Sequence, residues 1–342
     1  MAITSTPAES IRLGSSEDLL AAAPYLLGYH PADSMAFLGL TSGAVTVSGR
    51  YDLSTPECEG DPAPIVATLL RHGVDSALLI GYGPPERVTA DMDRLRGALA
   101  AADVPVREAL RVTGGRYWSY LCGDVGCCPC DGTPFDLSTA RVAAAMTFAG
   151  LQTYPTREEL AATIASDHTD AVRDATGRAL GRFTALIHGD PGDWDRWRDE
   201  GLALLHRTVT AARDDDALPG DEDIAALSVL LTHDRVRDEA WALVDEHGPH
   251  TQLRLWSLVT RRADPDFAVV PALLLAFAAW RLGNGALARI AVERALTLAP
   301  EHRLALMLAQ VLDRGDSPVS LPPVTREWIA SYYEEETRAE PE

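Results

Sequence analysis

The sequence predicts an α/β domain with a mixed sheet, followed by an all-α domain that is partly tetratricopeptide-like. Up to about residue 152, short β-rich stretches alternate with helical ones, a pattern typical of α/β folds. Beyond that residue the β-rich stretches disappear, and helical patterns continue to Trp328. We therefore predict an α/β domain over residues 1–152, an all-α domain over residues 153–332, and an acidic, disordered tail over residues 333–342.

Two short connections between strands make the predicted sheet mixed, because only antiparallel strands can be joined by a hairpin. Ser15-Ser16-Glu17-Asp18 is typical of an N-cap with acids in the first turn of a helix, and Gly28 suits the end of that helix. The elements expected next, in order, are strands at 35–40 and 44–53, a helix at 65–72, a strand at 76–80, a helix at 86–102, strands at 104–112 and 116–121, and a helix at 137–150.

The helical region opens with the capping box Thr156-Arg157-Glu158-Glu159. One later segment has the small residues and final proline of a tetratricopeptide unit, and in it Ala288 and Ala295 are expected at the contact between two helices. We expect Arg281, just before this segment, to be exposed. Breaks between helices are predicted at Gly192, Gly220, Gly248, Pro265, Gly283 and Gly315.

Composition excludes several classes of function. Acidic residues outnumber basic ones by 50 to 30, for a net charge of −20, so the chain repels phosphate backbones and we expect no nucleic-acid partner. Every basic residue is an arginine, which excludes mechanisms that need a lysine. The longest apolar stretch, residues 267–280, is too short to span a bilayer and contains Pro271. We expect a cytoplasmic protein that has no membrane partner.

Four of the five cysteines lie in the predicted loop 122–130. Clustered thiols in a reducing compartment favour metal or redox chemistry over structural disulfides. However, the spacing C-x4-C-C-x-C lacks the second knuckle of a zinc ribbon, and adjacent cysteines are expected to point their side chains apart. Three interpretations stay open: zinc held by Cys122, Cys127 and Cys128, reversible thiol chemistry, or a loop with neither role. Zinc is the one cofactor considered, and His30, His72 or Asp124 would have to complete its site.

Arg116 and Trp118 lie on the strand that leads into this loop. Arg116 is a candidate anion contact, whereas an aromatic residue such as Trp118 on a strand is typical of packing. His30 and Asp33 form a second candidate site ahead of the strand 35–40. In a parallel sheet their loop would lie at the edge opposite to the usual ligand-binding edge, so we expect Asp33 to cap a turn. The turn Gly81-Tyr82-Gly83-Pro84 lies at the favourable edge, but it carries only two glycines of a dinucleotide fingerprint.

Three stretches, Pro24–Ser34, Arg116–Pro129 and Phe277–Ala288, together resemble the signatures of the actinobacterial family catalogued as domain of unknown function 4192. The resemblance extends from about Ile11 to Trp328. It places Cys122, Cys127 and Cys128 on the family's cysteine positions and leaves Cys130 as an extra one. It implies an actinobacterial, cytoplasmic origin and a two-part architecture, and it implies no substrate.

No catalytic motif is recognisable, which favours a non-enzymatic role. We predict an interaction or scaffold module whose helical half binds a protein partner. The alternative is a ligand-binding, redox or metal-dependent domain that uses the cysteine loop, with an unknown small-molecule ligand.

Overall fold

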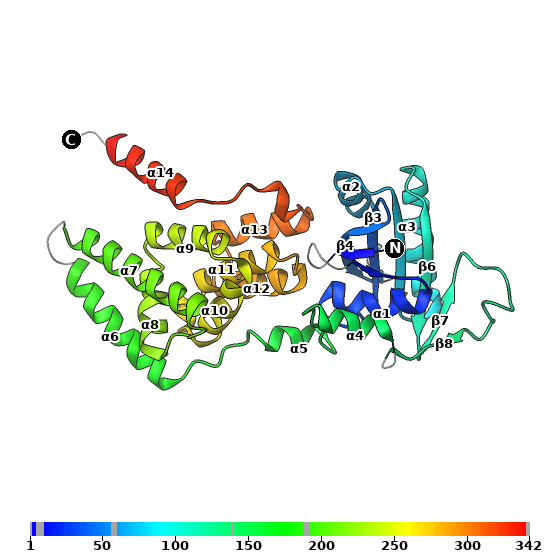
Figure 1. Ribbon diagram of the computed structural model, residues 1–342, viewed down its shortest axis with the longest axis horizontal. Helices are drawn as coiled ribbons and strands as arrows, with labels where there is room; N and C mark the ends of the chain where they lie inside the picture. The colour runs from blue at the N-terminus through cyan, green and yellow to red at the C-terminus, as the bar shows by residue number, and fades with distance from the viewer. Residues whose placement is uncertain (1, 5–9, 56–59, 138–139, 188–191, 340–342) are drawn as a thin grey trace. The chain divides into compact units, whose positions relative to one another are not determined.

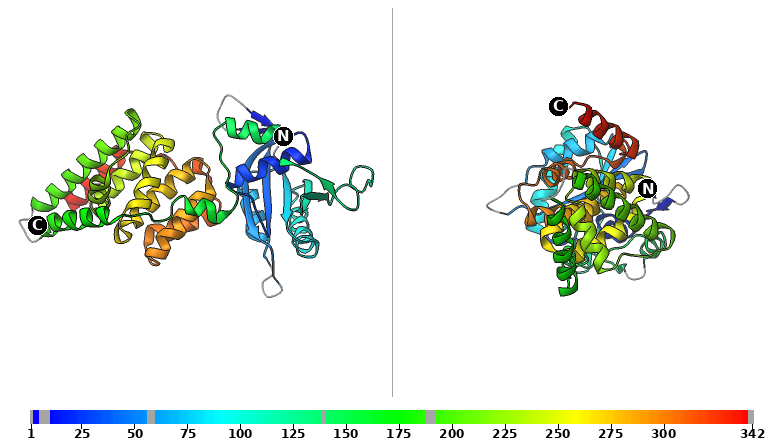
Figure 2. Two further views of the ribbon diagram at one scale, coloured as in Figure 1. Left: turned by 90° about the horizontal axis from the view of Figure 1, so that it is seen from below. Right: turned by 90° about the vertical axis from the view of Figure 1, so that its left-hand side faces the viewer.

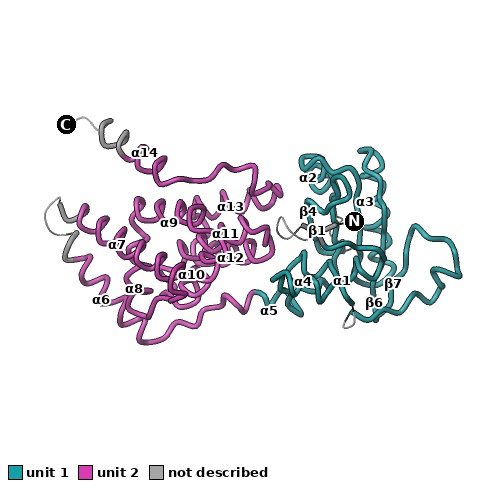
Figure 3. The backbone as a smooth tube through the Cα atoms, in the orientation of Figure 1, with its two compact units in different colours: residues 1–160 teal, residues 161–342 magenta. Residues whose placement is uncertain are grey.

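The computed structural model describes residues 2–4, 10–55, 60–137, 140–187 and 192–339. It divides into two compact units, residues 1–160 and 161–342 (Figure 3). The sheet belongs to the first unit, and the described part of the second unit contains helices and loops (Figure 1). The predicted order, a mixed sheet and then helices, is confirmed.

The sheet of the first unit has the strand order β2-β1-β4-β3-β5-β6-β7-β8. β5 and β6 are parallel, whereas β3 is antiparallel to both β4 and β5. The β3–β4 and β6–β7 hairpins are the two short connections that the sequence predicts. β1 and β2, which the sequence does not predict, extend one edge. The strands are β1 (Ala2–Thr4), β2 (Ser10–Arg12), β3 (Ser34–Thr41), β4 (Ala44–Asp52), β5 (Ser76–Tyr82), β6 (Val106–Thr113), β7 (Arg116–Ser119) and β8 (Thr133–Pro134).

Helices cover both faces of this sheet, because side chains along each strand point alternately to opposite sides. On β3, Ala36 and Leu38 pack with α1 (Ser16–Leu27) and α4 (Arg141–Phe148). Met35 and Phe37, on the same strand, pack with α2 (Ala63–Arg71) and α3 (Pro85–Ala101). The first unit is therefore a three-layer α/β/α sandwich, seen from a second direction in Figure 2.

Composition predicts the boundary of the first unit at residue 152, but the unit continues to residue 160. The N–H of Tyr154 donates to the carbonyl of Gly28 over 3.0 Å, and the N–H of His30 donates to the carbonyl of Tyr154 over 2.9 Å. The hydroxyl of Thr153 donates to the carbonyl of Pro24 over 3.0 Å. These bonds attach the residues just after 152 to the end of α1, so they belong to the first unit.

The helices of the second unit begin or end at the predicted breaks. Gly220 and Gly248 are N-caps, and Gly283 and Gly315 follow helices with positive φ. The helices are α5 (Arg157–Ala162), α6 (Asp170–Ile187), α7 (Gly192–Asp214), α8 (Asp221–Leu230), α9 (Asp234–Glu246), α10 (Pro249–Arg262), η2 (Pro265–Phe267), α11 (Val269–Arg281), α12 (Gly285–Leu298), α13 (Arg303–Asp313), η3 (Pro318–Ser320) and α14 (Arg326–Ala339), of which α5 spans the boundary.

The apolar stretch noted in the sequence is the buried helix of the second unit. Every residue from Pro271 to Trp280 is buried in α11, which packs against both α10 and α12. Among the described residues, no helix combines the length and the hydrophobicity needed to cross a bilayer. At the other end of the unit, α14 continues to Ala339, so residues 333–339 are helical where composition predicts disorder. Residues 340–342 lie outside the described part.

Candidate metal centre

The cysteine loop, residues 120–132, connects β7 to β8 and projects away from the sheet (Figures 1 and 2). The Sγ atoms of Cys122, Cys127 and Cys128 all lie within 4.8 Å of one another. A turn brings them together, because the carbonyl of Asp124 accepts from the N–H groups of Cys127 at 3.1 Å and of Cys128 at 2.7 Å. The expectation that adjacent cysteines point apart is therefore wrong here, since it assumes an extended chain and the chain turns at Asp124.

Cys122 and Cys128 differ in how readily they lose a proton. The N–H of Asp124 donates to the Cys122 sulfur, which lowers the pKa of Cys122. Cys128 donates its own thiol proton to Cys122, and this bond raises the pKa of Cys128 to about 12. Of these two thiols Cys122 therefore loses its proton first, and a second thiolate beside it is unfavourable unless a cation is present.

Trp118 and Arg116 hold the end of the cysteine loop that returns to the sheet. The indole N–H of Trp118 donates to the carbonyl of Cys130 over 3.1 Å. Nη1 of Arg116 donates to the carbonyls of Asp131, at 3.1 Å, and of Gly132, at 2.5 Å, and pairs with the Asp131 carboxylate. Arg116 is therefore a positioning residue for the loop, and its charge is already paired with Asp131.

Ser119 holds the other end of the loop. Its hydroxyl accepts from the N–H groups of Leu121 and Cys122 and donates to Glu108 over 3.0 Å. The second carboxylate oxygen of Glu108 accepts from Ser16 on α1 at 2.9 Å. Both ends of the loop are thus fixed to the sandwich, which limits how far the three thiols can separate.

The remaining sequence candidates lie outside this cluster. In the described part of the chain, the group of side chains placed to share a metal ion consists of Cys122, Cys127 and Cys128. His30, His72 and Asp124 are not members, nor is the exposed Cys130. The fifth cysteine, Cys58, lies outside the described residues.

The sequence predicts that Asp33 caps its turn, but in the described part of the chain its carboxylate pairs with Arg87. The backbone of Asp33 has a φ of 43°, and the carboxylate accepts from Nη1 of Arg87 at 3.1 Å. The expected edge is wrong. Because β3 is antiparallel to β5, Ser34 pairs with Tyr82, and the loop with His30 and Asp33 lies at the carboxyl end of β5.

Sequence reasoning missed a buried acid on α3. Asp91 is 2% exposed and accepts from the N–H of Ser54 at 2.7 Å and from its hydroxyl at 2.6 Å. It also pairs with Arg94, one turn along the helix. An acid on the apolar face of the helix 86–102, next to Met92, is the signal that could have revealed it.

It also missed the environment of Arg281, which is not exposed as predicted. The side chain is 10% exposed and pairs with Asp245 over 2.8 Å. Its burial depends on residues far along the chain, and its place as the last residue of a long buried helix is the signal that the sequence offers.

A family model described as "Domain of unknown function (DUF4192)" matches residues 17–319. Neither a curated protein nor a solved structure matches the chain. The match includes the cysteine loop and most of the helical unit, and it ends before α14.

Proposed function

The chain belongs to the DUF4192 family, and since that description assigns no activity, we propose from geometry that its first unit is a zinc-binding module. Cys122, Cys127 and Cys128 are the proposed ligands. Zn–S bonds of about 2.3 Å in a tetrahedral site require sulfurs about 3.8 Å apart. Since the three Sγ atoms already lie within 4.8 Å of one another, shifts of about an ångström would complete the contacts.

The donor set selects the metal. Three thiolates suit Zn²⁺ or Cu⁺, whereas Mg²⁺ and Ca²⁺ prefer oxygen ligands. Three protein ligands leave the fourth position of a tetrahedral zinc ion for water or an exchangeable group, as in catalytic rather than structural zinc sites. Reduced thiols also fit a cytoplasmic location.

Elemental analysis of protein purified under reducing conditions tests this proposal. We expect about one equivalent of zinc in the natural chain and in Cys130→Ser, and loss of the metal in Cys122→Ser. Cys130→Ser is the matched control, because it makes the same change in the same loop outside the cluster. Protein without metal, or metal retained by Cys122→Ser, would refute the zinc site.

Reversible thiol chemistry is the competing use of the same cluster. Two of these thiols can form a disulfide only if an oxidant removes two electrons, and Cys122 would pair with Cys127 or Cys128. Mass spectrometry after mild oxidation would detect this bond. A loop disulfide that forms readily in metal-free natural protein would favour the redox role over zinc.

For the helical unit we propose a role as an interaction scaffold that binds another protein. The packing of α12 supports it: Ala288 and Ala295 are fully buried, as close-packed helices of a tetratricopeptide-like hairpin require. On α13, Leu306 and Met307 are exposed and offer apolar contacts.

A further inference from the structure

An ion pair joins the C-terminal ends of two helices of the second unit, and both of its side chains are largely buried. Arg281 at the end of α11 and Asp245 near the end of α9 have side chains only 10% and 11% exposed. Trp280, next to Arg281, is buried as well. We call these three residues the clamp, and all of them lie inside the family match.

The clamp binds the backbone of a proline-containing stretch of the same chain that includes the short 3-10 helix η3. Arg281 donates to the carbonyls of Pro318 at 2.7 Å, Leu321 at 2.8 Å and Pro322 at 3.2 Å. Trp280 donates to the carbonyl of Asp316 over 3.0 Å, and Asp245 accepts from the N–H of Val324 at 3.0 Å. Since every one of these contacts reaches main-chain atoms, the clamp recognises the course of the backbone, including the turn at Pro318, rather than a particular set of side chains.

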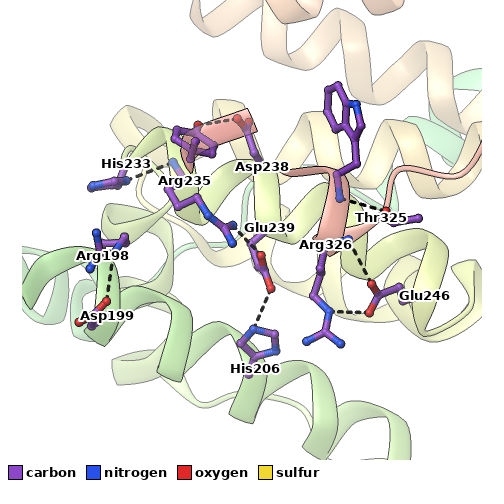
Figure 4. Close-up of polar contacts among 12 residues, drawn as sticks. Arg198, Asp199, His206, His233, Arg235, Asp238, Glu239, Glu246, Thr325 and Arg326 are labelled. Carbon is purple, nitrogen blue, oxygen red and sulfur yellow. Dashed lines mark hydrogen bonds and ion pairs between the residues drawn. The ribbon is translucent and has the colours of Figure 1, made fainter. Parts of the chain in front are cut away.

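The helix that follows this stretch, α14, docks on α9 (Figure 4). Nε of Arg326 donates to Glu246 over 2.7 Å, and the hydroxyl of Tyr333 donates to Asp238 over 2.7 Å. Ile329 lies between them in sequence and is 2% exposed. These three residues of α14 have the spacing i, i+3, i+7, so they share one helix face.

The contacts of α14 resemble those of a bound ligand more than those of a core helix. Among its side chains that the structure describes, residues 326–333, Ile329 is buried, whereas Trp328 is 63% exposed. The other attachments are polar and partly open to water, so local opening of α14 is inexpensive. The family match also ends before this helix, whereas the residues that bind it lie inside the match.

We propose that the clamp and the adjoining face of α9 form a peptide-binding surface that the C-terminal segment, residues 316–339, occupies in cis. Its partner in trans is a protein segment of the same chemistry. Such a segment has a proline-containing stretch with a short 3-10 turn, followed by a helix with an arginine, an aliphatic residue and a tyrosine at the spacing i, i+3, i+7. The arginine of this segment pairs with Glu246 of α9, and the tyrosine hydroxyl donates to Asp238 of α9. This inference rests on the proposed scaffold role and names the surface that performs it.

Competition between the cis segment and a free peptide tests the proposal on the full chain. The probe is a fluorescent synthetic peptide with the sequence of residues 315–339, and its anisotropy reports binding. Ile329→Asp removes the buried anchor of the cis segment and leaves the clamp unchanged. We expect the peptide to bind this variant at least about tenfold more tightly than the natural chain, because the competing occupant is weakened. Ser331→Asp makes the same charge change at an exposed position off the docking face of the same helix and should leave the affinity unchanged.

A second substitution assigns the binding to the clamp. In the Ile329→Asp background, Asp245→Asn should weaken peptide binding by about tenfold, whereas Asp266→Asn at an exposed position should not. If Asp245→Asn fails to give native circular dichroism, Asp238→Asn removes the partner of Tyr333 and serves instead.

Equal peptide binding by the natural chain and Ile329→Asp, or no binding by either, would overturn the proposed surface. A dimer of the natural chain that Ile329→Asp dissociates, measured by light scattering, would assign the surface to a second copy and overturn it too. Screening Ile329→Asp against a random peptide library separates this failure from failure of the scaffold role. If peptides bind and Asp245→Asn does not weaken their binding, the scaffold role is supported and the proposed surface is refuted. If no peptide binds, both are refuted.

Discussion

Single side chains determine the shape of the cysteine loop more than its cysteines do. Trp118 receives the guanidinium of Arg111 over its ring at 3.6 Å and donates to the carbonyl of Cys130. Gly132 lies against the same ring, where an added Cβ would come within 2.5 Å of the indole. The sequence shows the cysteines themselves, but their convergence depends on the backbone turn at Asp124, which no spacing rule specifies.

Replacing Gly132 with alanine should therefore destabilise the first unit. Gly132 has a φ of 82°, and its Cβ would overlap Trp118, so we expect a loss of about 1–3 kcal/mol in the free energy of unfolding. Gly123→Ala in the same loop is the control, since nothing lies within 4 Å of its added Cβ. Urea denaturation measures both, and equal effects would show that Trp118 does not constrain the loop.

Two ion pairs on α3 provide a matched comparison at the same scale. Asp91→Ala leaves Ser54 and Arg94 without their buried partner, and we expect a loss of about 2–3 kcal/mol, because Arg94 retains access to water. Asp93 pairs with Arg96 at the same spacing, but its side chain is exposed, so Asp93→Ala should cost less than about 1 kcal/mol. Thermal unfolding of both variants checks the difference. Similar losses would mean that burial of Asp91 contributes nothing.

At the scale of elements, sequence patterns predict where helices and strands lie better than how they are arranged. Ser15 and Gly28 cap α1 as expected, with Gly28 in the left-handed region. The direction of β3 relative to β5 could not be predicted, because it depends on which strands become neighbours in the folded sheet. Likewise, local pattern places Arg281 at the surface, because the stretch that covers it, near Pro318, lies far along the chain.

The packing of α12 against α11 gives a prediction about one helix pair. Ala288 is fully buried on α12, which packs against α11, so Ala288→Leu should overpack its surroundings and cost about 1–3 kcal/mol. Thr297→Leu adds a similar apolar side chain at an exposed position of the same helix and should be nearly neutral. If urea unfolding shows equal losses, α12 does not form the proposed close-packed hairpin.

The start of α9 gives a prediction about pH. Nδ1 of His233 accepts the N–H of Arg235 as the helix N-cap, which requires a neutral ring. Burial lowers the pKa of His233 from 6.5, and the guanidinium groups of Arg198, Arg235 and Arg237 lower it further, against the opposing charge of Asp234.

Because the folded pKa of His233 is below the unfolded one, its contribution to stability is present above the unfolded pKa and is lost as the pH falls through the folded pKa. His233→Asn keeps a capping side chain that does not titrate. Between about pH 7 and pH 5 the natural chain should therefore lose more stability than this variant. Melting curves at each pH test this, and parallel pH profiles would contradict it.

For the whole molecule, composition correctly separates a sheet-containing part from a helical part, yet it places their boundary too early. The residues after 152 carry no β-rich pattern of their own. They belong to the first unit because Tyr154 bonds to both Gly28 and His30, and such pairing across more than a hundred residues is invisible to local patterns.

This boundary leads to a prediction about two fragments that differ only at their C-terminal ends. Residues 1–160 contain the sheet, both helical layers and the bonds of Thr153 and Tyr154, so this fragment should unfold cooperatively and show β-containing circular dichroism. Residues 1–152 lack those bonds, and three hydrogen bonds at about 1 kcal/mol each predict a stability lower by about 2–3 kcal/mol. Urea denaturation of both fragments measures the difference. If they are equally stable, residues 153–160 are a linker, and if neither folds, the first unit depends on the helices that follow it.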